Sequence, residues 1–254
     1  AMAAAIDART RAVAVSTVTF MPGYRTDLAP IAKAAKSHDA LLIVDATQSV
    51  GVLATDVKAM GVDALVTSTH KYLLGVYGQG FLYLAPEWAE RLAPVFVGAA
   101  GYSDPTAHPA ASDFAWTKAA GARRFETGHA YLSAAIAAAS LELLLEAGPA
   151  AIEAQATGRA ADLARGLAEQ GWPVNADPYG LPQSQIVTLG TIQPGDLYAV
   201  GDPTLQRLHA ALEEAGVRHS ARRGALRFSF HLFNDAEDVA KVLEVAESVR
   251  RAAA

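Results

Sequence analysis

The stretch that decides the fold reads LLIVDATQSVG at residues 41–51 and DALVTSTHKYLLGVYGQGFLYL at residues 63–84. Each part contains a short apolar run with β-branched residues, Leu41–Val44 in the first and Ala64–Thr67 in the second, and the segment between the two runs is long enough for a crossover connection. Strands that alternate with such connections are typical of βαβ units and of a parallel sheet. Ligands bind such sheets beyond the carboxyl ends of the strands. The stretch therefore predicts a ligand site beside Asp45 and Ser68–Lys71, which follow the two strands.

The polar residues expected at this edge have the chemistry needed to hold an aromatic aldehyde cofactor by both ends. Asp45 can pair with a protonated ring nitrogen, because a nearby opposite charge stabilises the cation. Lys71 can lose its proton in a desolvated cleft and form a Schiff base with the aldehyde. Ser68 and His70 can reach a phosphate group. The cofactor would then carry the chemistry, while the protein would position and tune it.

Each of these residues also has a structural interpretation when it is taken alone. An Asp after an apolar strand is often a turn or helix-cap residue, a Lys there is usually solvated, and a single His is more often structural than catalytic. The combination favours a functional site, because these polar residues end two neighbouring apolar strands and are followed by Gly75, Gly78 and Gly80.

The segments VDATQSVG (residues 44–51) and STHKYLLGVYGQGFLY (residues 68–83) resemble the signature of class V aminotransferase-type enzymes, which use pyridoxal 5′-phosphate (PLP). This family includes cysteine desulfurases, selenocysteine lyases, kynureninases, isopenicillin epimerases and small aminotransferases. The resemblance implies the α/β fold of the PLP-dependent transferases, which is the aspartate aminotransferase-like fold type I. That fold combines a mostly parallel sheet with a smaller α+β carboxyl-terminal domain.

The resemblance also implies a role for each polar residue of the two segments. Asp45 would pair with the pyridine nitrogen, and Gln48 would hydrogen-bond the phenolic oxygen of the ring. Ser68 and His70 would bind the phosphate, and Lys71 would be the Schiff-base lysine.

Three further stretches extend the resemblance along the chain. Residues 15–40 resemble the strand and helix that precede the Asp, and they place Thr17 where some members carry an Asn near the cofactor ring. Residues 121–148 resemble the segment that leads into the long helix between the two domains. Residues 226–239, LRFSFHLFNDAEDV, resemble the substrate-carboxylate motif and assign Arg227 to the substrate α-carboxylate, which a bidentate guanidinium suits.

Two residues near the amino end have alternative interpretations. Tyr24 and Arg25, in PGYRTD, match a Tyr-Arg pair of some relatives and would then contact the substrate. A structural ion pair is the alternative for this pair, and we weigh the two readings equally.

Two departures from the family pattern affect the expected site. Many relatives follow the Gly of RRFETG with a Thr or Asn that reaches the phosphate of the partner subunit, whereas this chain has His129, which can still donate a hydrogen bond. Relatives also carry a long segment before the strand expected at Val13–Val18, and it supplies a phosphate-binding turn and a ring-stacking residue. This chain starts at Ala1 with AMAAAIDART instead.

Composition narrows the class of protein. The 254 residues are 52% hydrophobic and carry a net charge of −5, which favours a well-buried α/β protein and gives no indication of nucleic-acid binding. The chain contains no cysteine, so it cannot itself supply the thiol that carries the persulfide in a cysteine desulfurase. No secretion signal is evident at the amino end, and we expect a cytoplasmic homodimer without a metal.

The resemblance implies two domains, a partial large PLP-binding α/β domain at residues 1–148, which includes the interdomain helix, and a small α+β domain at residues 149–254. The long segment 99–122 is expected to be a loop. The expected strands are Val13–Val18, Leu41–Val44, Ala64–Thr67, Gly80–Leu84, Ile186–Leu189, Val217–Ser220 and Ala225–Phe230. The expected helices are Asp27–Ser37, Pro86–Leu92, Tyr131–Ala147, Pro149–Gln170, Asp202–Ala215 and Asp235–Arg251.

These observations lead to one main hypothesis and two alternatives. The main hypothesis is a PLP-dependent enzyme that acts on an α-amino acid through Lys71, as a carbon–sulfur lyase or a desulfurase-like enzyme without a persulfide cysteine. The first alternative is an aminotransferase or epimerase of the same family. The second is a non-catalytic or split fragment that needs a second polypeptide, or its symmetry mate, to supply the missing amino-terminal segment.

Overall fold

The computed structural model describes residues 2–102, 117–128 and 130–252, and the chain divides into two compact units. The first unit comprises Ala1–Thr17, Asp27–Gly51 and Thr55–Leu145, and the second comprises Val18–Thr26, Val52–Ala54 and Glu146–Ala254. Two short segments from the amino-terminal half therefore pack with the carboxyl-terminal unit. The expected division at residue 148, with each domain a continuous stretch, stays a prediction.

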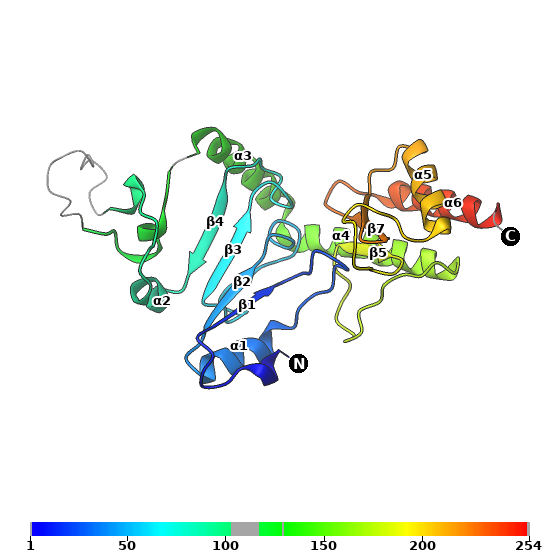
Figure 1. The fold of residues 1–254 in the computed structure, drawn as a ribbon. Coiled ribbons are helices and arrows are strands. Elements are labelled where there is room, and N and C mark those ends of the chain that lie inside the picture. The colour runs from blue at the N-terminus through cyan, green and yellow to red at the C-terminus, as the bar shows by residue number, and fades with distance from the viewer. Residues whose placement is uncertain (1, 103–116, 129, 253–254) are drawn as a thin grey trace. The chain divides into compact units, whose positions relative to one another are not determined.

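A four-stranded sheet forms the centre of the first unit, with the strands in the order β1-β2-β3-β4 (Figure 1). The strands are β1 (Ala12–Ser16), β2 (Leu41–Asp45), β3 (Ala64–Ser68) and β4 (Gly80–Leu84). The pairs β1–β2 and β2–β3 are parallel, whereas β3 and β4 are antiparallel. The parallel arrangement brings the carboxyl ends of β1, β2 and β3 to one edge of the sheet, as expected.

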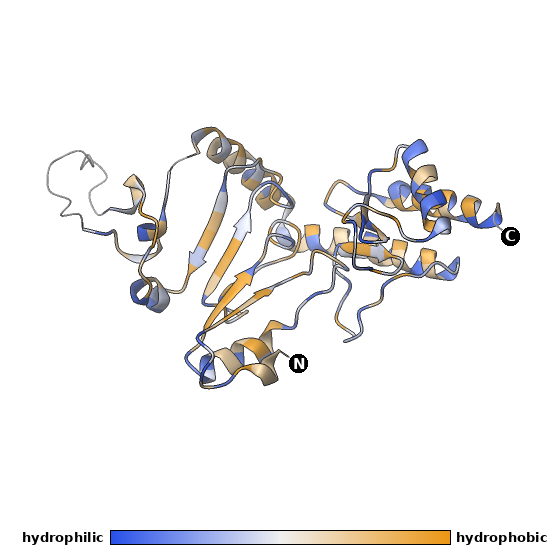
Figure 2. Cartoon of the chain, viewed as in Figure 1, coloured by the Kyte–Doolittle hydropathy of each residue, from blue (hydrophilic) through white to orange (hydrophobic). Residues whose placement is uncertain are grey.

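Helices cover both faces of this sheet. Successive residues of a strand point to opposite faces, so Leu42 and Val44 of β2 pack in one apolar cluster with α1 (Leu28–Ser37), while Leu41 packs in another with Ala89 of α2 (Pro86–Arg91). Burial on both faces explains why β2 is apolar along most of its length, as its colouring in Figure 2 shows.

The connection from β2 to β3 consists of turns, and no helix forms there, so the βαβ pattern that the sequence suggests is not realised at this crossover. Two glycines interrupt the segment, because Gly51 and Gly61 have φ values of +100° and +64°. Residues 52–54 pack with the second unit.

The second unit contains a three-stranded antiparallel sheet in the order β5-β7-β6 and three long helices. Its elements are α4 (Pro149–Glu169), β5 (Ile186–Leu189), α5 (Pro203–Glu214), β6 (Ser220–Arg222), β7 (Ala225–Ser229) and α6 (Ala236–Arg251). Hydrophobic and hydrophilic residues alternate along α4 and α6 in Figure 2, which is the pattern of helices with one buried face. The fully buried leucines of the unit are Leu163, Leu167, Leu189, Leu208, Leu212 and Leu226.

The strand expected at Val217–Ser220 begins later than the sequence pattern indicates. Val217 donates its backbone N–H to the carbonyl of Leu212 at 2.8 Å, and Gly216 has a φ of +73°, so these residues close the end of α5. The strand then runs from Ser220 to Arg222 and turns into β7 through Arg223 and Gly224, which both have positive φ. A two-residue turn of this kind suits the twist of a tight hairpin.

The helix α3 (Tyr131–Ala147) has the bounds that the sequence predicts. The expected loop at residues 99–122 contains the short 3-10 helix η2 (Ala99–Gly101) and the start of η3 (Gly121–Phe125), and its centre lies outside the described residues. A further 3-10 turn, η1 (Ala3–Ala5), precedes β1. No single helix in the described ranges is long and apolar enough to cross a membrane; only α3 and α4 taken together would be, by length and composition.

Candidate cofactor-binding site

Asp45 ends β2 at the carboxyl edge of the first sheet. In the strand register it lies opposite Ser16 of β1 and Val66 of β3, two residues before Ser68. Its carboxylate is exposed and accepts one hydrogen bond, from the backbone N–H of Thr47 at 2.9 Å. The strand geometry thus presents a negative charge at the edge where a parallel sheet binds ligands.

Thr17 and Ser49 form a second polar pair at this edge. Their hydroxyl oxygens lie 2.6 Å apart, and the Thr17 N–H donates to the carbonyl of Asp45 at 3.0 Å. Ser49 is 2% exposed and also donates to the carbonyl of Ala46. The sequence pattern did not single out Ser49, and its position in VDATQSVG, one residue after the buried Gln48, was the available signal.

The loop that carries His70 and Lys71 is tightly closed. The buried Thr69 links its two sides, since its N–H donates to the carbonyl of Gln79 at 3.2 Å and its carbonyl accepts the N–H of Gly75 at 2.8 Å. A Cβ on Gly75 would lie 2.8 Å from Cβ of Thr69, so a larger residue does not fit there. The loop therefore has little freedom, which suits a site that must hold Lys71 in one place.

The same loop packs closely on the segment after β2. A Cβ on Gly51 would lie 2.1 Å from the carbonyl oxygen of Tyr72, and Gly51 has a φ of +100°, so only glycine fits at this position. Gly51 and the backbone of Tyr72 and Leu73 are thus direct neighbours within the first unit. This contact brings the two segments that carry Gln48 and Lys71 together, although 23 residues separate them in sequence (71 − 48 = 23).

Ser68 and His70 are the residues expected to bind phosphate. The Ser68 hydroxyl oxygen is buried and has no hydrogen-bond partner among the described residues. The His70 ring stacks on the Tyr77 ring, with centroids 4.1 Å apart. Buried polar groups in proteins are nearly always hydrogen-bonded, so an unpartnered hydroxyl two residues before a histidine fits a site for an oxygen-rich ligand such as phosphate.

The substrate-contact residues expected from the sequence lie in the second unit. Arg227 is on β7, opposite Thr188 and Ser220 in the sheet register, and its guanidinium lies 4.8 Å from the ring centroid of Phe20. An aromatic face at this distance favours a cation.

Tyr24 and Arg25 both have structural partners within the second unit. The Tyr24 hydroxyl donates to the carbonyl of Ala176 at 2.7 Å, and burial raises the pKa of this phenol, with a smaller contribution from the charge of Asp177. Arg25 forms an ion pair with Glu153 at 2.9 Å, and the other carboxylate oxygen of Glu153 accepts the N–H of Ala54. The structural alternative considered for Arg25 is thus present in the fold, and the predicted substrate contacts of both residues stay predictions.

The structure brings Thr17, Asp45, Gln48, Ser68, His70 and Lys71 into one unit, and it gives Tyr24, Arg25 and Arg227 to the other. The remaining predicted ligand, His129, lies outside the described residues. The donor set of the first unit fits PLP, because it offers a carboxylate for a ring nitrogen, an amine for an aldehyde, and a hydroxyl and an imidazole for a phosphate.

Comparison with known proteins identifies relatives of this fold. A family model described as aminotransferase class-V matches residues 1–242. The chain is 33% identical over 231 residues to YcbU of Bacillus subtilis, an uncharacterized aminotransferase, and the match covers 91% of this chain and 57% of that protein.

Solved structures also include relatives of this fold. The apo structure of a cysteine desulfurase from Thermococcus onnurineus NA1 superposes with a TM-score of 0.78 at 26% identity, over 95% of this chain and 60% of that one. The cystine C–S lyase C-DES, in complex with its product cysteine persulfide, has a TM-score of 0.77 at 25% identity, over 96% and 63% of the two chains. A further C-DES structure has glycine covalently linked to its PLP cofactor.

These likenesses confirm the predicted fold class, a PLP-dependent α/β fold of type I, and the predicted family resemblance. They also confirm PLP as the cofactor of the family. The chain spans less than two thirds of the length of each of these relatives.

Proposed function

The chain belongs to the class V aminotransferase family, and from this premise we propose that it forms the cofactor-bearing part of a PLP-dependent enzyme acting on an α-amino acid. The carboxyl edge of the first sheet carries this proposal. There Asp45 ends one parallel strand, and Ser68, whose hydroxyl is buried and has no partner among the described residues, ends the next, two residues before His70 and three before Lys71.

The proposed cofactor contacts follow from the chemistry of each side chain. Asp45 would favour the protonated ring nitrogen, because its carboxylate is the opposite charge. Lys71 would carry the cofactor on its Nζ atom. The residues proposed to hold the cofactor are Thr17, Asp45, Gln48, Ser68, His70, Lys71 and His129.

Two residues would then act on the substrate. When bound, PLP withdraws electrons from the substrate α-carbon and so lowers the barrier to breaking a bond there. Lys71 would move a proton at that carbon through Nζ, as general base or general acid within hydrogen-bond reach. Arg227 would hold the α-carboxylate with two parallel hydrogen bonds and so orient the bond to be broken. Tyr24 and Arg25 are secondary candidates for substrate contact, because the hydrogen bond of Tyr24 and the ion pair of Arg25 already give them a structural role.

A carbon–sulfur lyase or desulfurase-like reaction is the first choice of reaction type. Its support is the likeness to a cysteine desulfurase and to the cystine C–S lyase C-DES. The 254 residues contain no cysteine, so these residues cannot carry a persulfide, and direct elimination is favoured over persulfide transfer. Transamination is the alternative, because the chain is also 33% identical to an aminotransferase, and epimerisation belongs to the same family of reactions.

The enzyme is proposed to work as a homodimer, or with a second polypeptide that supplies the part of the fold this chain does not span. The matches cover 57% to 63% of the three relatives, which leaves room for further parts of the fold on the same or on another chain. A split or non-catalytic chain is the competing possibility, and a co-purifying second chain on a denaturing gel would distinguish it.

The test of the proposal is an intact-mass spectrum after incubation with PLP and reduction with borohydride. We expect a phosphopyridoxyl adduct on the wild type and none on Lys71→Ala. Lys58→Ala, which removes an exposed lysine of the same unit, is the control and should retain the adduct. An adduct that persists in Lys71→Ala, or its absence from the wild type with excess PLP, would refute the proposal for this chain.

Product analysis would then identify the reaction type. Elimination from a sulfur-containing amino acid releases ammonia, an oxo acid and a sulfur product. Transamination requires an added oxo acid as amino acceptor, and epimerisation changes only the optical purity. A lyase predicts ammonia release without any added oxo acid.

A further inference from the structure

We propose that Tyr77 is a positioning residue of the cofactor site, which holds the His70 imidazole in the orientation that binds the phosphate ester. This inference rests on the proposed function, since the anion concerned is the phosphate of the cofactor. It assigns a task to an exposed tyrosine that lies six residues after Lys71 (77 − 71 = 6).

The two rings form a near-parallel stack. Their centroids lie 4.1 Å apart, and their planes make an angle of 19°. Tyr77 is 79% exposed, so the burial of its own surface does not explain the position of its ring. Within the described part of the chain, the His70 imidazole contacts the Tyr77 ring, and neither ring nitrogen of His70 has a hydrogen-bond partner. Both nitrogens can therefore serve an anion, while one face of the ring is covered.

The loop is built so that the two rings meet. Thr69, next to His70, donates its hydroxyl hydrogen to the carbonyl of Val76, next to Tyr77, at 2.8 Å. The same hydroxyl lies 3.1 Å from the carbonyl of Gln79, on the other side of Tyr77. Thr69 is completely buried, so these contacts are shielded from competing water. The backbones that carry the two rings are thus joined through one side chain.

A second anchor fixes Tyr77 from outside the loop. The hydroxyl of Ser133, on α3, donates to the carbonyl of Tyr77 at 3.0 Å. Gly78 follows with a φ of +93°, a conformation that lets the chain turn away directly after the tyrosine. Tyr77 is therefore held on both sides, although its side chain is exposed.

The stack matters because the last torsion of a histidine side chain is broad. Rotation about this bond changes the direction of both ring nitrogens, and a hydrogen bond to a phosphate oxygen depends on that direction. A flat neighbour at van der Waals distance restricts the rotation. The imidazole then loses less freedom when it binds the anion, which strengthens binding without any new contact to the ligand.

The affinity of the apo protein for PLP and for pyridoxal, which lacks the phosphate, tests this role. Tyr77→Ala should weaken PLP binding roughly threefold to tenfold and leave pyridoxal binding unchanged. Tyr77→Phe should retain wild-type affinity, because the phenyl ring preserves the stack. Tyr179→Ala is the matched control, since Tyr179 is 78% exposed in the second unit, and it should bind PLP like the wild type.

A double-mutant cycle shows whether Tyr77 acts through His70. Once His70 is replaced by Ala, removal of Tyr77 should cause no further loss of PLP affinity. Equal weakening of PLP and pyridoxal by Tyr77→Ala, or losses from the two substitutions that simply add, would overturn the inference. Circular dichroism of each variant verifies that the fold is retained.

A separate readout covers the case in which the wild type does not bind PLP and the proposed function fails. Inorganic phosphate would be titrated into the apo protein while the ring signals of His70 are followed by NMR. We expect phosphate to shift these signals in the wild type and to shift them less in Tyr77→Ala. Signals that do not respond to phosphate in the wild type, or that respond equally in both proteins, would refute the role of Tyr77 independently of the cofactor.

Discussion

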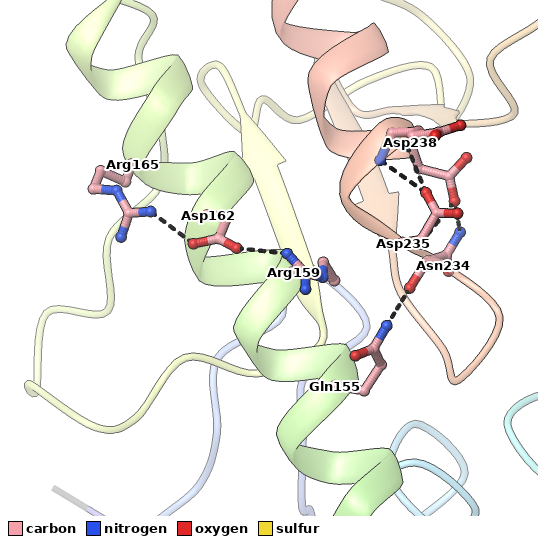
Figure 3. A network of polar contacts seen from close by, with 8 residues as sticks. Gln155, Arg159, Asp162, Arg165, Asn234, Asp235 and Asp238 are labelled. Atoms are coloured by element: carbon pink, nitrogen blue, oxygen red, sulfur yellow. Dashed lines mark hydrogen bonds and ion pairs between the residues drawn. The ribbon is translucent and has the colours of Figure 1, made fainter.

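Two polar regions of this protein look alike in sequence and differ in how their hydrogen bonds are satisfied. In the loop that opens α6, shown in Figure 3, the polar side chains bind one another and the backbone. Gln155 donates to the carbonyl of Asn234 at 2.7 Å, Asn234 donates to Asp238 at 2.9 Å, and Asp235 caps the helix by accepting the N–H groups of Glu237 and Asp238.

At the carboxyl edge of the first sheet, Asp45 and Ser68 make fewer hydrogen bonds to the rest of the protein. The buried Ser68 hydroxyl has no partner among the described residues, and the exposed Asp45 carboxylate accepts one N–H group. Leaving a buried polar group unpaired costs about 1–3 kcal/mol, so a stable fold keeps such groups where a ligand pairs with them. The closed network therefore has a structural role, and the open one has the character of a binding site.

The largest expected effect comes from Asp45→Asn, which removes the charge and keeps an acceptor for the Thr47 N–H. We expect the rate of amino-acid turnover to fall about 10- to 1000-fold, because a nearby carboxylate shifts the pKa of a paired base by about 1–3 units. The free energy of unfolding should change little. Steady-state kinetics and urea denaturation measure the two quantities.

The same substitution at Asp235 is the matched control for that experiment. Asn is as good a helix N-cap as Asp, so Asp235→Asn should change neither turnover nor stability appreciably. If Asp235→Asn lowered turnover as much as Asp45→Asn, the contrast between the two regions would be wrong.

Removal of the Asp235 cap should have the opposite effect to Asp45→Asn, lowering stability without affecting the cofactor site. Asp235→Ala deletes the acceptor of two backbone N–H groups and one half of a capping box, so the free energy of unfolding should fall by about 1–2 kcal/mol. PLP affinity should not change. Urea denaturation measures the difference in the free energy of unfolding. Glu244→Ala, at an exposed position in the middle of α6, is the control. An unchanged denaturation midpoint would show that the network of Figure 3 does not stabilise the fold.

Glu153→Gln should have a smaller effect and sharpen the interpretation of Arg25. The Glu153 carboxylate is about three-quarters buried and joins Arg25 to the backbone of Ala54. The amide can still accept the Ala54 N–H but loses the ion pair, so we expect a loss of about 1 kcal/mol in the free energy of unfolding. KM for the amino acid should stay the same if Arg25 is purely structural. A raised KM would instead favour the predicted substrate contact.

The smallest effect concerns acid stability in the second unit. Burial lowers the pKa of His219 below its usual value of 6.5. The hydrogen bond to the Val217 carbonyl raises this pKa, whereas the neighbouring His209 lowers it further. The unfolded chain therefore takes up this proton more readily than the folded one. The stabilising contribution is present above about pH 6.5 and is lost as the pH falls through the lower, folded-state pKa.

The urea midpoint of the wild type should thus decrease between pH 7.5 and pH 5.5, and the decrease should be smaller in His219→Gln. His38→Gln, which changes an exposed histidine of the first unit, should behave like the wild type. The hydrogen bond from Arg91 lowers the pKa of Asp39. The stability that this carboxylate contributes is therefore present above the usual pKa range of carboxylates and is lost only in stronger acid. Identical pH profiles for the wild type and His219→Gln would contradict the assignment.

The order of elements and the candidate cofactor residues could be predicted because they depend on local physics. Asp27 and Asp202 accept the first N–H groups of α1 and α5, and Pro149 opens α4 after Gly148, so these helices begin within a residue of the predicted positions. The apolar runs before Asp45 and Ser68 form β2 and β3 for the same reason, since alternation and β-branching act within a few residues.

The departures occur where the conformation depends on distant parts of the chain. The segment after Asp45 has no helix because Gly51 packs against the Tyr72 carbonyl and residues 52–54 join the second unit. The strand β6 starts late because Val217 is used to close α5.

The sequence by itself determined the family, the fold class and the chemistry available at the sheet edge, because side-chain type and short-range spacing carry that information. Only the tertiary structure decided which polar residues are partnered. It pairs Arg25 with Glu153, 128 residues away, joins Thr17 to Ser49, and sets Tyr77 against His70. Those contacts depend on how the chain closes on itself, and no local pattern encodes the distance between two side chains that meet only after folding.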